Sequence, residues 1–167
     1  CDAVKFQKRN PDVCVPEHQK SVMRDTPWGK MTYLDYKYKV EFNKEEYDEI
    51  DSYCKQQNIA WSASPWDMDS LKFLSQYNIP FIKLPSAMLT NDVLLEGCVA
   101  TGKQVIFSTG MSTQEEIDHA VNILREAKVK YNNRHEIGLL HCNSTYPAPI
   151  EELNLSGIKT LAERYPD

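Results

Sequence analysis

The chain has 167 residues, of which 41% are hydrophobic and 26% are charged, and its formal net charge at pH 7 is -5. These values are typical of one globular domain with a sizeable core, and the acidic balance disfavours nonspecific nucleic-acid binding. No apolar stretch approaches the roughly 18 residues of a membrane helix, and the first residues lack the basic and apolar regions of a signal peptide.

The five cysteines are widely spaced, and no two of them form a CxxC pair. This pattern supports neither structural zinc nor a disulfide framework. It favours reduced thiols in a cytoplasmic protein.

Short apolar runs that each end in polar residues predict parallel strands. They lie near residues 2–7, 59–64, 80–84, 104–109 and 136–142. Segments with helical spacing separate most of these runs, so the chain is predicted to fold as repeated strand–helix units. Proteins of this kind place their chemistry at the carboxyl ends of the parallel strands.

Capping signals mark the starts of three predicted helices. Asn43 with Glu46 predicts a capping box, and Asp67 can cap the next helix. Ser112 with Glu115 predicts a second capping box before an amphipathic helix.

Two further helices are expected from hydrophobic spacing and stop signals. One covers 91–101 and ends with Gly102 in the C′ position. The other covers 156–165, with Ile158 and Leu161 predicted to face inward.

Residues 8–42 interrupt the strand–helix pattern with a long polar and aromatic segment. Several turn-forming residues punctuate it: Pro11, Pro16, Pro27 and Gly29. A loop this long inside a compact domain is usually functional or disordered, and its aromatic content argues for order. We therefore interpret it as a wall of the active site.

Five strand–helix units fit either an open doubly wound sheet or most of a (β/α)8 barrel. Alternating polar side chains at Lys5 and Gln7 suit the layered interior of a barrel. The chain starts directly on a strand pattern and stops just after a helical one. We therefore expect residues 1–167 to be a piece of a longer protein.

Two lysines, Lys5 and Lys83, lie inside apolar strand patterns. Each could snorkel at a strand end or pair with a carboxylate. Because both strands are predicted to end at the same edge of the sheet, we favour a site that binds an anion. The point charge of a lysine suits phosphate.

Two strand ends add groups that could hold such an anion. Ser108 to Ser112 forms a turn in which a glycine lets the backbone approach a phosphate, although the hydroxyls could simply cap the next helix. After the last strand, we predict a structural His141, with Ser144 and Tyr146 at the rim as substrate contacts. His141 and Cys142 are not a metal pair, because adjacent strand residues point to opposite faces.

The order and spacing of these motifs resemble the N-acetylneuraminate (sialic acid) synthase family over essentially the whole chain. The motifs are Lys5-Phe6-Gln7, Ser62-Ala63-Ser64-Pro65, Lys83 to Ser86, Ser108-Thr109-Gly110-Met111 and His141 to Pro147. The family fold is a (β/α)8 TIM barrel followed by a small antifreeze-like domain. The resemblance implies an α/β partial barrel over 1–167, matching strands two to six. The first strand, the last two strands and the antifreeze-like domain would be absent, and the full-length protein would be a homodimer.

The resemblance also implies condensation of phosphoenolpyruvate with N-acetylmannosamine, an open-chain N-acyl-mannosamine sugar, to form sialic acid and phosphate. The residues implied to hold phosphoenolpyruvate are Lys5, Ser64, Lys83, Ser86, Ser108 and Ser144. Gln7 and Tyr146 would contact the sugar, and Lys5 and Lys83 would act in catalysis by stabilising charge on the carboxylate and leaving phosphate.

The chain departs from this family pattern at two points. The divalent metal, manganese or magnesium, which polarises the sugar aldehyde, is held by histidines that have no match here, so we expect none of its ligands in this chain and an inactive fragment. Many members also carry a carboxylate where this chain has Met88.

Three other functions compete with this one. A synthase of a related nonulosonate, legionaminate or pseudaminate, is the nearest. Another phosphoenolpyruvate-condensing barrel, such as one making deoxy-octulosonate phosphate, is the second. A non-enzymatic flavodoxin-like module is disfavoured, because it would need acidic residues where the first strands carry lysines.

Overall fold

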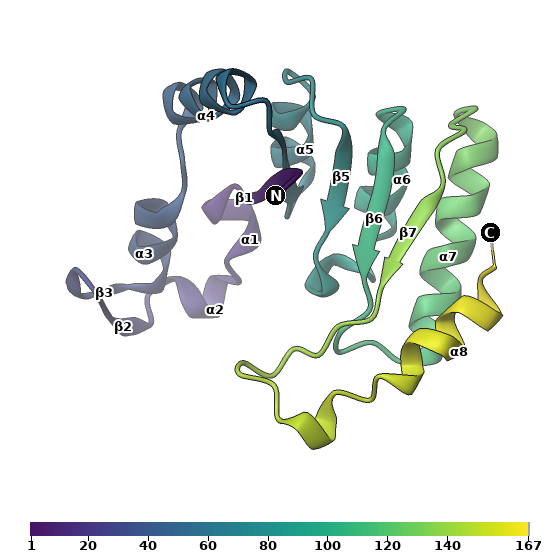
Figure 1. The fold of residues 1–167 in the computed structure, drawn as a ribbon. Coiled ribbons are helices and arrows are strands. Elements are labelled where there is room, and N and C mark those ends of the chain that lie inside the picture. The colour runs from purple at the N-terminus through teal and green to yellow at the C-terminus, as the bar shows by residue number, and fades with distance from the viewer. Residues whose placement is uncertain (167) are drawn as a thin grey trace. The chain divides into compact units, whose positions relative to one another are not determined.

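The computed structural model describes residues 1–166 and confirms an α/β fold in which strands and helices largely alternate along the chain (Figure 1). The chain forms two compact units, Cys1–Asn78 and the part that begins at Ile79. No helix within the described residues is long and apolar enough to cross a membrane.

In the first unit, β1 (Ala3–Lys8) and β4 (Ala60–Pro65) pair in parallel. Two helices accompany them, α4 (Lys44–Gln56) and α5 (Met68–Leu74). The predicted starts of both helices are confirmed. Asn43 and Glu46 form a reciprocal capping box, and the Asp67 side chain accepts a hydrogen bond from the Ser70 backbone N–H.

The prediction of one long loop over 8–42 is wrong, because this segment contains short regular elements. They are α1 (Pro11–Cys14), α2 (Glu17–Lys20), the antiparallel pair β2 (Met23–Thr26) and β3 (Gly29–Thr32), and α3 (Tyr33–Val40). Pro11 is the first residue of α1, where the N–H group that proline lacks would be unpaired anyway. Pro16 is the N-cap residue that precedes α2. Gly29 takes a positive φ of 97° beside the hairpin turn.

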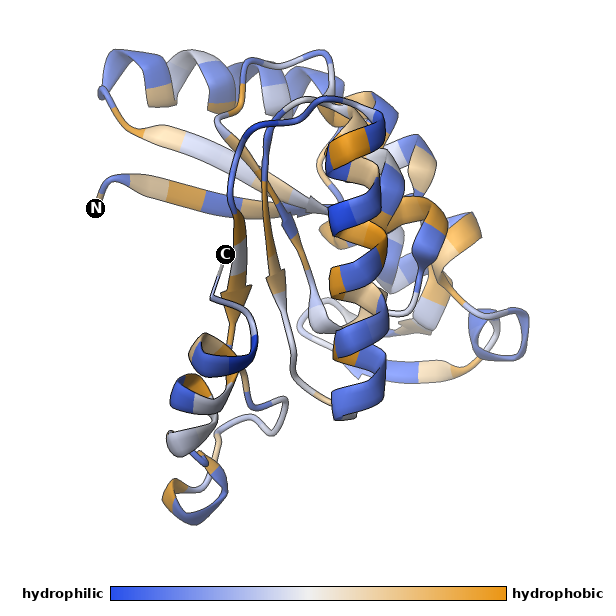
Figure 2. Cartoon of the chain, turned by 90° about the vertical axis from the view of Figure 1, so that its right-hand side faces the viewer, coloured by the Kyte–Doolittle hydropathy of each residue, from blue (hydrophilic) through white to orange (hydrophobic). Residues whose placement is uncertain are grey.

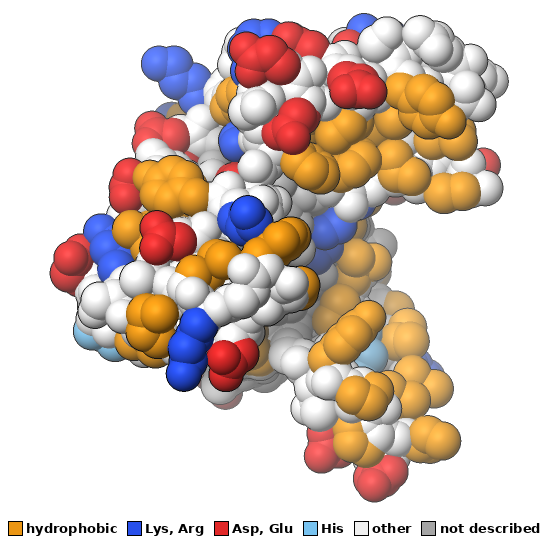
Figure 3. All heavy atoms as spheres, turned by 90° about the vertical axis from the view of Figure 1, so that its left-hand side faces the viewer, with side chains coloured by type: hydrophobic (Ala, Val, Ile, Leu, Met, Phe, Trp, Pro, Cys, Tyr) orange, Lys and Arg blue, Asp and Glu red, His pale blue; other side chains and the backbone are white. Residues whose placement is uncertain are grey.

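The surface of this insert mixes aromatic and charged side chains. Trp28 and Tyr38 are exposed, and Lys39 lies over the Trp28 ring at 5.3 Å. Figure 3 shows hydrophobic and charged side chains interspersed on the side of the molecule that carries the insert.

The second unit is a three-stranded parallel sheet in the order β5 (Phe81–Leu84), β6 (Gln104–Ser108), β7 (Ile137–Leu140). Figure 1 shows α6 (Asp92–Ala100) and α7 (Gln114–Lys130) on one face of this sheet. Two 3-10 turns, η1 (Ser86–Met88) and η2 (Ile150–Glu152), and the helix α8 (Ser156–Arg164) complete it. The α7 helix is amphipathic, with hydrophobic and hydrophilic bands visible in Figure 2.

Two helix details of this unit differ from prediction. The capping box of α7 uses Thr113 and Glu116, one residue later than predicted, because the Ser112 hydroxyl instead donates to the Gly110 carbonyl. Ile158 was expected to face inward but is 55% exposed, since it borders a shallow depression beside β7 that no described residue covers. The positive φ of Gly102 after α6 agrees with the predicted C′ position.

The core of the first unit is an aromatic cluster centred on Tyr47 of α4. Its ring is fully buried and lies 5.2–6.5 Å, between centroids, from five other aromatic rings: Phe6, Phe42, Trp61, Phe73 and Tyr77. The Tyr47 hydroxyl donates a hydrogen bond of 2.7 Å to the Gln7 carbonyl. Tyr47 therefore ties α4 to the strand that carries Lys5 and Gln7.

Replacing Tyr47 with alanine should lower the free energy of unfolding by about 3–5 kcal/mol, because it leaves a cavity inside the aromatic cluster. Tyr47→Phe keeps the ring and loses only the hydrogen bond, so we expect about 0.5–1.5 kcal/mol. Chemical denaturation of the full-length protein measures both losses. Tyr53→Ala, at an exposed tyrosine of the same helix, is the control; a Tyr47→Ala loss no larger than that of Tyr53→Ala would contradict the prediction.

Candidate active site

The first unit places Lys5 and Gln7 on the same face of β1, two residues apart. In the register of the parallel pair, Lys5 lies opposite Ser62 and Gln7 opposite Ser64. The Lys5 ammonium donates to the Ser64 hydroxyl at 3.5 Å, and Ser64 is fully buried. The structure therefore brings together three of the residues predicted to form the site.

The electrostatic surroundings of Lys5 favour an anionic ligand. Although part of its side chain reaches solvent, burial lowers the pKa of Lys5, and the positive charge of Arg9 lowers it further. Both effects oppose the protonated ammonium, so a bound anion would offset them.

The second unit gathers serines around Gly110, in the turn that follows β6. The Gly110 backbone N–H donates to the Ser86 hydroxyl at 3.1 Å. A Cβ placed on Gly110 would lie 2.6 Å from the Ser144 hydroxyl oxygen and 3.0 Å from that of Ser86. Ser86, Ser108 and Ser144 follow or end β5, β6 and β7, so the structure brings these three predicted residues to one edge of the sheet.

The hydroxyl of Ser108 is buried and has no hydrogen-bond partner among the described residues. A buried polar group without a partner costs free energy, and such groups are rare in folded proteins. A ligand oxygen at this edge would supply the missing partner.

Lys83 lies between Ile82 and Leu84, which are both buried. Because side chains alternate along a strand, Lys83 projects from the face of the sheet opposite to the one that carries Ile82 and Leu84. Lys5 and Lys83 belong to different units. Their convergence on one anion therefore stays a prediction.

The segment after β7 contains one predicted residue with a clear partner and one without. The His141 Nε2 atom lies 2.9 Å from the Leu153 carbonyl oxygen, and its ring packs against Gly157, contacts that fit the predicted structural role. Tyr146 is 99% exposed, so its sugar contact stays a prediction.

A cavity of about 350 Å³ lies beside the Gly110 turn. Polar groups that line it include Thr109, Ser112, His141, Asn143 and Asn154. Asn143, which the sequence reasoning did not select, accepts from the Thr145 backbone N–H and donates to the Glu152 carbonyl. Asparagine often bonds the backbone N–H group two residues ahead in a turn. This tendency is the local sequence signal that could have pointed to Asn143.

Arg9 and Glu41 were also missed. The Arg9 guanidinium donates to the side-chain oxygen of Gln7, and its Nε lies 3.5 Å from a carboxylate oxygen of Glu41. Within residues 1–166, no group of three or more His, Cys, Asp or Glu side chains is arranged to hold a metal ion.

Gly110→Ala should lower the free energy of unfolding by about 1–3 kcal/mol, because the added methyl group would overlap the Ser144 hydroxyl. Removing that hydroxyl in the double variant Gly110→Ala/Ser144→Ala should restore part of the loss. Denaturation curves of both variants and of Ser144→Ala alone measure this coupling. An unchanged stability in Gly110→Ala would show that the turn is looser than the structure indicates.

Comparisons with known proteins show which proteins this chain resembles over nearly all of its length. The chain is 33% identical to an N-acetylneuraminate-9-phosphate synthase of Drosophila melanogaster, over 100% of this chain and 44% of that protein. It is 31% identical to an N,N'-diacetyllegionaminic acid synthase of Campylobacter jejuni, over 98% of this chain and 49% of that protein.

Among solved structures, the crystal structure of an N-acetylneuraminic acid (sialic acid) synthetase from Leptospira borgpetersenii in complex with citrate superposes with a TM-score of 0.83. It is 29% identical and covers 98% of this chain and 51% of its own. The chain thus spans about half the length of the relatives that it matches. The family model that matches residues 1–167 is that of the NeuB family, and the chain belongs to this family.

Proposed function

We propose that the full-length protein condenses phosphoenolpyruvate with N-acetylmannosamine and water, releasing phosphate and forming sialic acid. The observation that carries this proposal is the cluster of Ser86, Ser108 and Ser144 around Gly110, in which the buried Ser108 hydroxyl lacks a partner. Phosphoenolpyruvate is a compact anion with several acceptor oxygens, and hydroxyls at a helix-preceding turn suit such a ligand.

In this proposal, the two units are consecutive parts of one (β/α)8 barrel, and residues 1–167 correspond to strands two to six. The parallel pairs β1–β4 and β5–β6–β7 support this, because a barrel joins such segments with all strand ends at one rim. The free thiols of all five cysteines support a cytoplasmic location.

The lysines and the serines would have different tasks. Lys5 and Lys83 would neutralise the carboxylate and phosphate charges and stabilise charge that develops on the leaving group. Ser64, Ser86, Ser108 and Ser144 would hold the anion in place. Holding it close to the sugar makes the bond-forming step effectively intramolecular.

Gln7 and Tyr146 would contact the sugar. Within residues 1–166, no group of three or more His, Cys, Asp or Glu side chains is arranged to hold a metal ion. The divalent metal that the family resemblance implies would therefore need ligands from outside these residues. We therefore assign no step of the reaction in this chain to a metal.

The full-length protein, supplied with manganese, phosphoenolpyruvate and N-acetylmannosamine, should release phosphate in step with formation of a nonulosonate detected by mass spectrometry. Phosphate release without the sugar product, or no turnover with any N-acylated amino sugar, would reject the proposed function.

Lys83→Ala should weaken phosphoenolpyruvate binding by roughly 1.5–3 kcal/mol, the size of a hydrogen bond to a charged group. The effect should appear in the dissociation constant of phosphoenolpyruvate and leave the thermal midpoint nearly unchanged. Lys72→Ala, at an exposed lysine of α5, is the matched control. Equal affinities of the two variants for phosphoenolpyruvate would show that Lys83 does not belong to the anion site.

A legionaminate-type synthase is the second candidate, and Met88 is the observation that favours it. Met88 ends the η1 turn that begins at Ser86, and its thioether is a weak acceptor for sugar hydroxyls. An apolar group at this position suits a sugar with fewer hydroxyls, such as the deoxygenated diacetamido precursor of legionaminate.

We expect Met88→Glu to raise the ratio of kcat/KM for N-acetylmannosamine over that for the deoxygenated diacetamido sugar by about tenfold, because a carboxylate restores an acceptor. Steady-state assays of the wild-type and variant proteins with both sugars measure this ratio. A large wild-type preference for N-acetylmannosamine that Met88→Glu leaves unchanged would show that position 88 does not select the sugar.

A further inference from the structure

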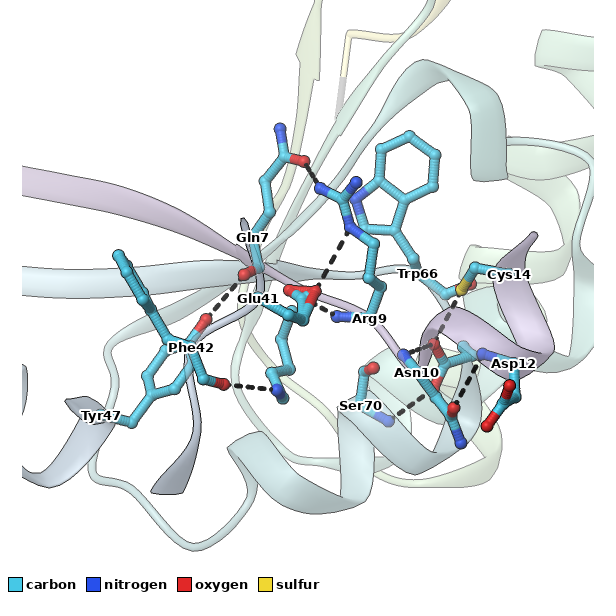
Figure 4. A network of polar contacts seen from close by, with 12 residues as sticks. Gln7, Arg9, Asn10, Asp12, Cys14, Glu41, Phe42, Tyr47, Trp66 and Ser70 are labelled. Atoms are coloured by element: carbon cyan, nitrogen blue, oxygen red, sulfur yellow. Dashed lines mark hydrogen bonds and ion pairs between the residues drawn. The ribbon is translucent and has the colours of Figure 1, made fainter. Parts of the chain in front are cut away.

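Arg9, the first residue after β1, connects Gln7 to an acidic side chain far along the sequence (Figure 4). The Arg9 guanidinium donates through Nη2 to the Gln7 side-chain oxygen. Its Nε lies 3.5 Å from one Glu41 carboxylate oxygen, while the Arg9 backbone N–H donates to the other at 3.3 Å. Glu41 therefore holds Arg9 at both its main chain and its side chain.

This ion pair is largely removed from solvent. The side chains of Arg9 and Glu41 are 13% and 9% exposed, and the guanidinium carbon of Arg9 lies 5.0 Å from the centre of the Trp66 ring. Burial raises the pKa of Glu41, against the opposing charges of Arg9 and Lys8. A pair that pays this desolvation cost contributes little net stability. Contact with Glu41 and the position over the Trp66 ring limit the places that the guanidinium can take.

That geometry determines how the Gln7 amide is oriented. A guanidinium has only donors, so the atom of Gln7 that faces Arg9 must be the carbonyl oxygen. The amide NH2 group then points away from Arg9, on the face of β1 that also carries Lys5. Gln7 therefore offers donors, and not an acceptor, to a ligand at this face.

We propose that Arg9, held by Glu41 and Trp66, is a positioning residue that locks the Gln7 amide so that its NH2 group donates to a carbonyl or hydroxyl oxygen of the acceptor sugar. This inference rests on the proposed condensation reaction and names a specificity determinant that lies outside the anion site. It requires the sugar to present an oxygen, and not an N–H group, at the position that faces Gln7.

A double-mutant cycle in the full-length protein separates positioning from a purely structural role. Arg9→Met should raise the KM for the sugar roughly 3- to 10-fold, the range of one hydrogen bond. The KM for phosphoenolpyruvate should change by a smaller factor, because Arg9 acts on the anion site only through its charge near Lys5. In the Gln7→Ala background, Arg9→Met should add less than about twofold, because Arg9 acts through Gln7. Gln7→Glu keeps the acceptor for Arg9 but removes the donors, so its sugar KM should rise as far as that of Gln7→Ala.

A second measurement does not depend on turnover. In protein labelled with ¹⁵N-glutamine, the side-chain amide of Gln7, assigned by its loss in Gln7→Ala, should show restricted motion by ¹⁵N relaxation. Arg9→Met should make this amide mobile. Arg134→Met, at an exposed arginine of the other unit, should leave it restricted and serves as the control.

The possible outcomes distinguish the two proposals. A mobile wild-type Gln7 amide, or additive effects of Arg9→Met and Gln7→Ala on the sugar KM, would overturn the positioning role. Full activity in Gln7→Glu would overturn the donor assignment. Absence of turnover with every N-acylated sugar would reject the proposed function and with it the sugar as the partner of Gln7, while the relaxation data would still decide whether Arg9 orients the amide.

Discussion

Parallel pairing is the constraint on which the candidate site depends. Since β5, β6 and β7 run in the same direction, their carboxyl ends must lie along one edge of the sheet. Ser86, Gly110 and Ser144 follow these three ends. Although they are far apart in the sequence, the Gly110 backbone N–H donates to the Ser86 hydroxyl, and the Ser144 hydroxyl lies against Gly110. The same rule acts in the first unit, where the register of β1 and β4 places Ser64 beside the face that carries Lys5.

Local signals were sufficient to predict most of the fold. The strands are marked by short apolar runs, and the helices α4, α5 and α7 combine apolar periodicity with a capping side chain, so that two signals agree with each other. For α6, apolar spacing agrees with the stop signal at Gly102. The α7 cap was misplaced by one residue because Ser112 and Thr113 both precede a glutamate at the required spacing. The segment 8–42 was misread because its elements are only four to eight residues long, too short for periodicity to be visible.

The candidate site was only partly predictable, for a related reason. Its serines stand at or after strand ends and its lysines lie inside strands, where sequence position implies spatial position. Arg9 and Glu41 meet across 32 residues of chain, and the local sequence around one gives no sign of its contact with the other. Likewise, a buried hydroxyl without a partner, as at Ser108, is a property of the packed structure, and a serine after an apolar run looks the same whether or not its hydroxyl is satisfied.

The buried pair also bears on the charge of the site. Arg9 and Lys5 are both cationic and come from the same end of β1, and the charge of Arg9 contributes to the lowered pKa of Lys5. Glu41 is the acidic partner of Arg9, and both of its carboxylate oxygens lie near Arg9 atoms. Within the described residues, Lys5 is left with a neutral serine hydroxyl as its hydrogen-bond partner. Glu41 forms its ion pair with Arg9, while the Lys5 ammonium donates to the neutral Ser64 hydroxyl, so an anionic ligand could offset the charge of Lys5.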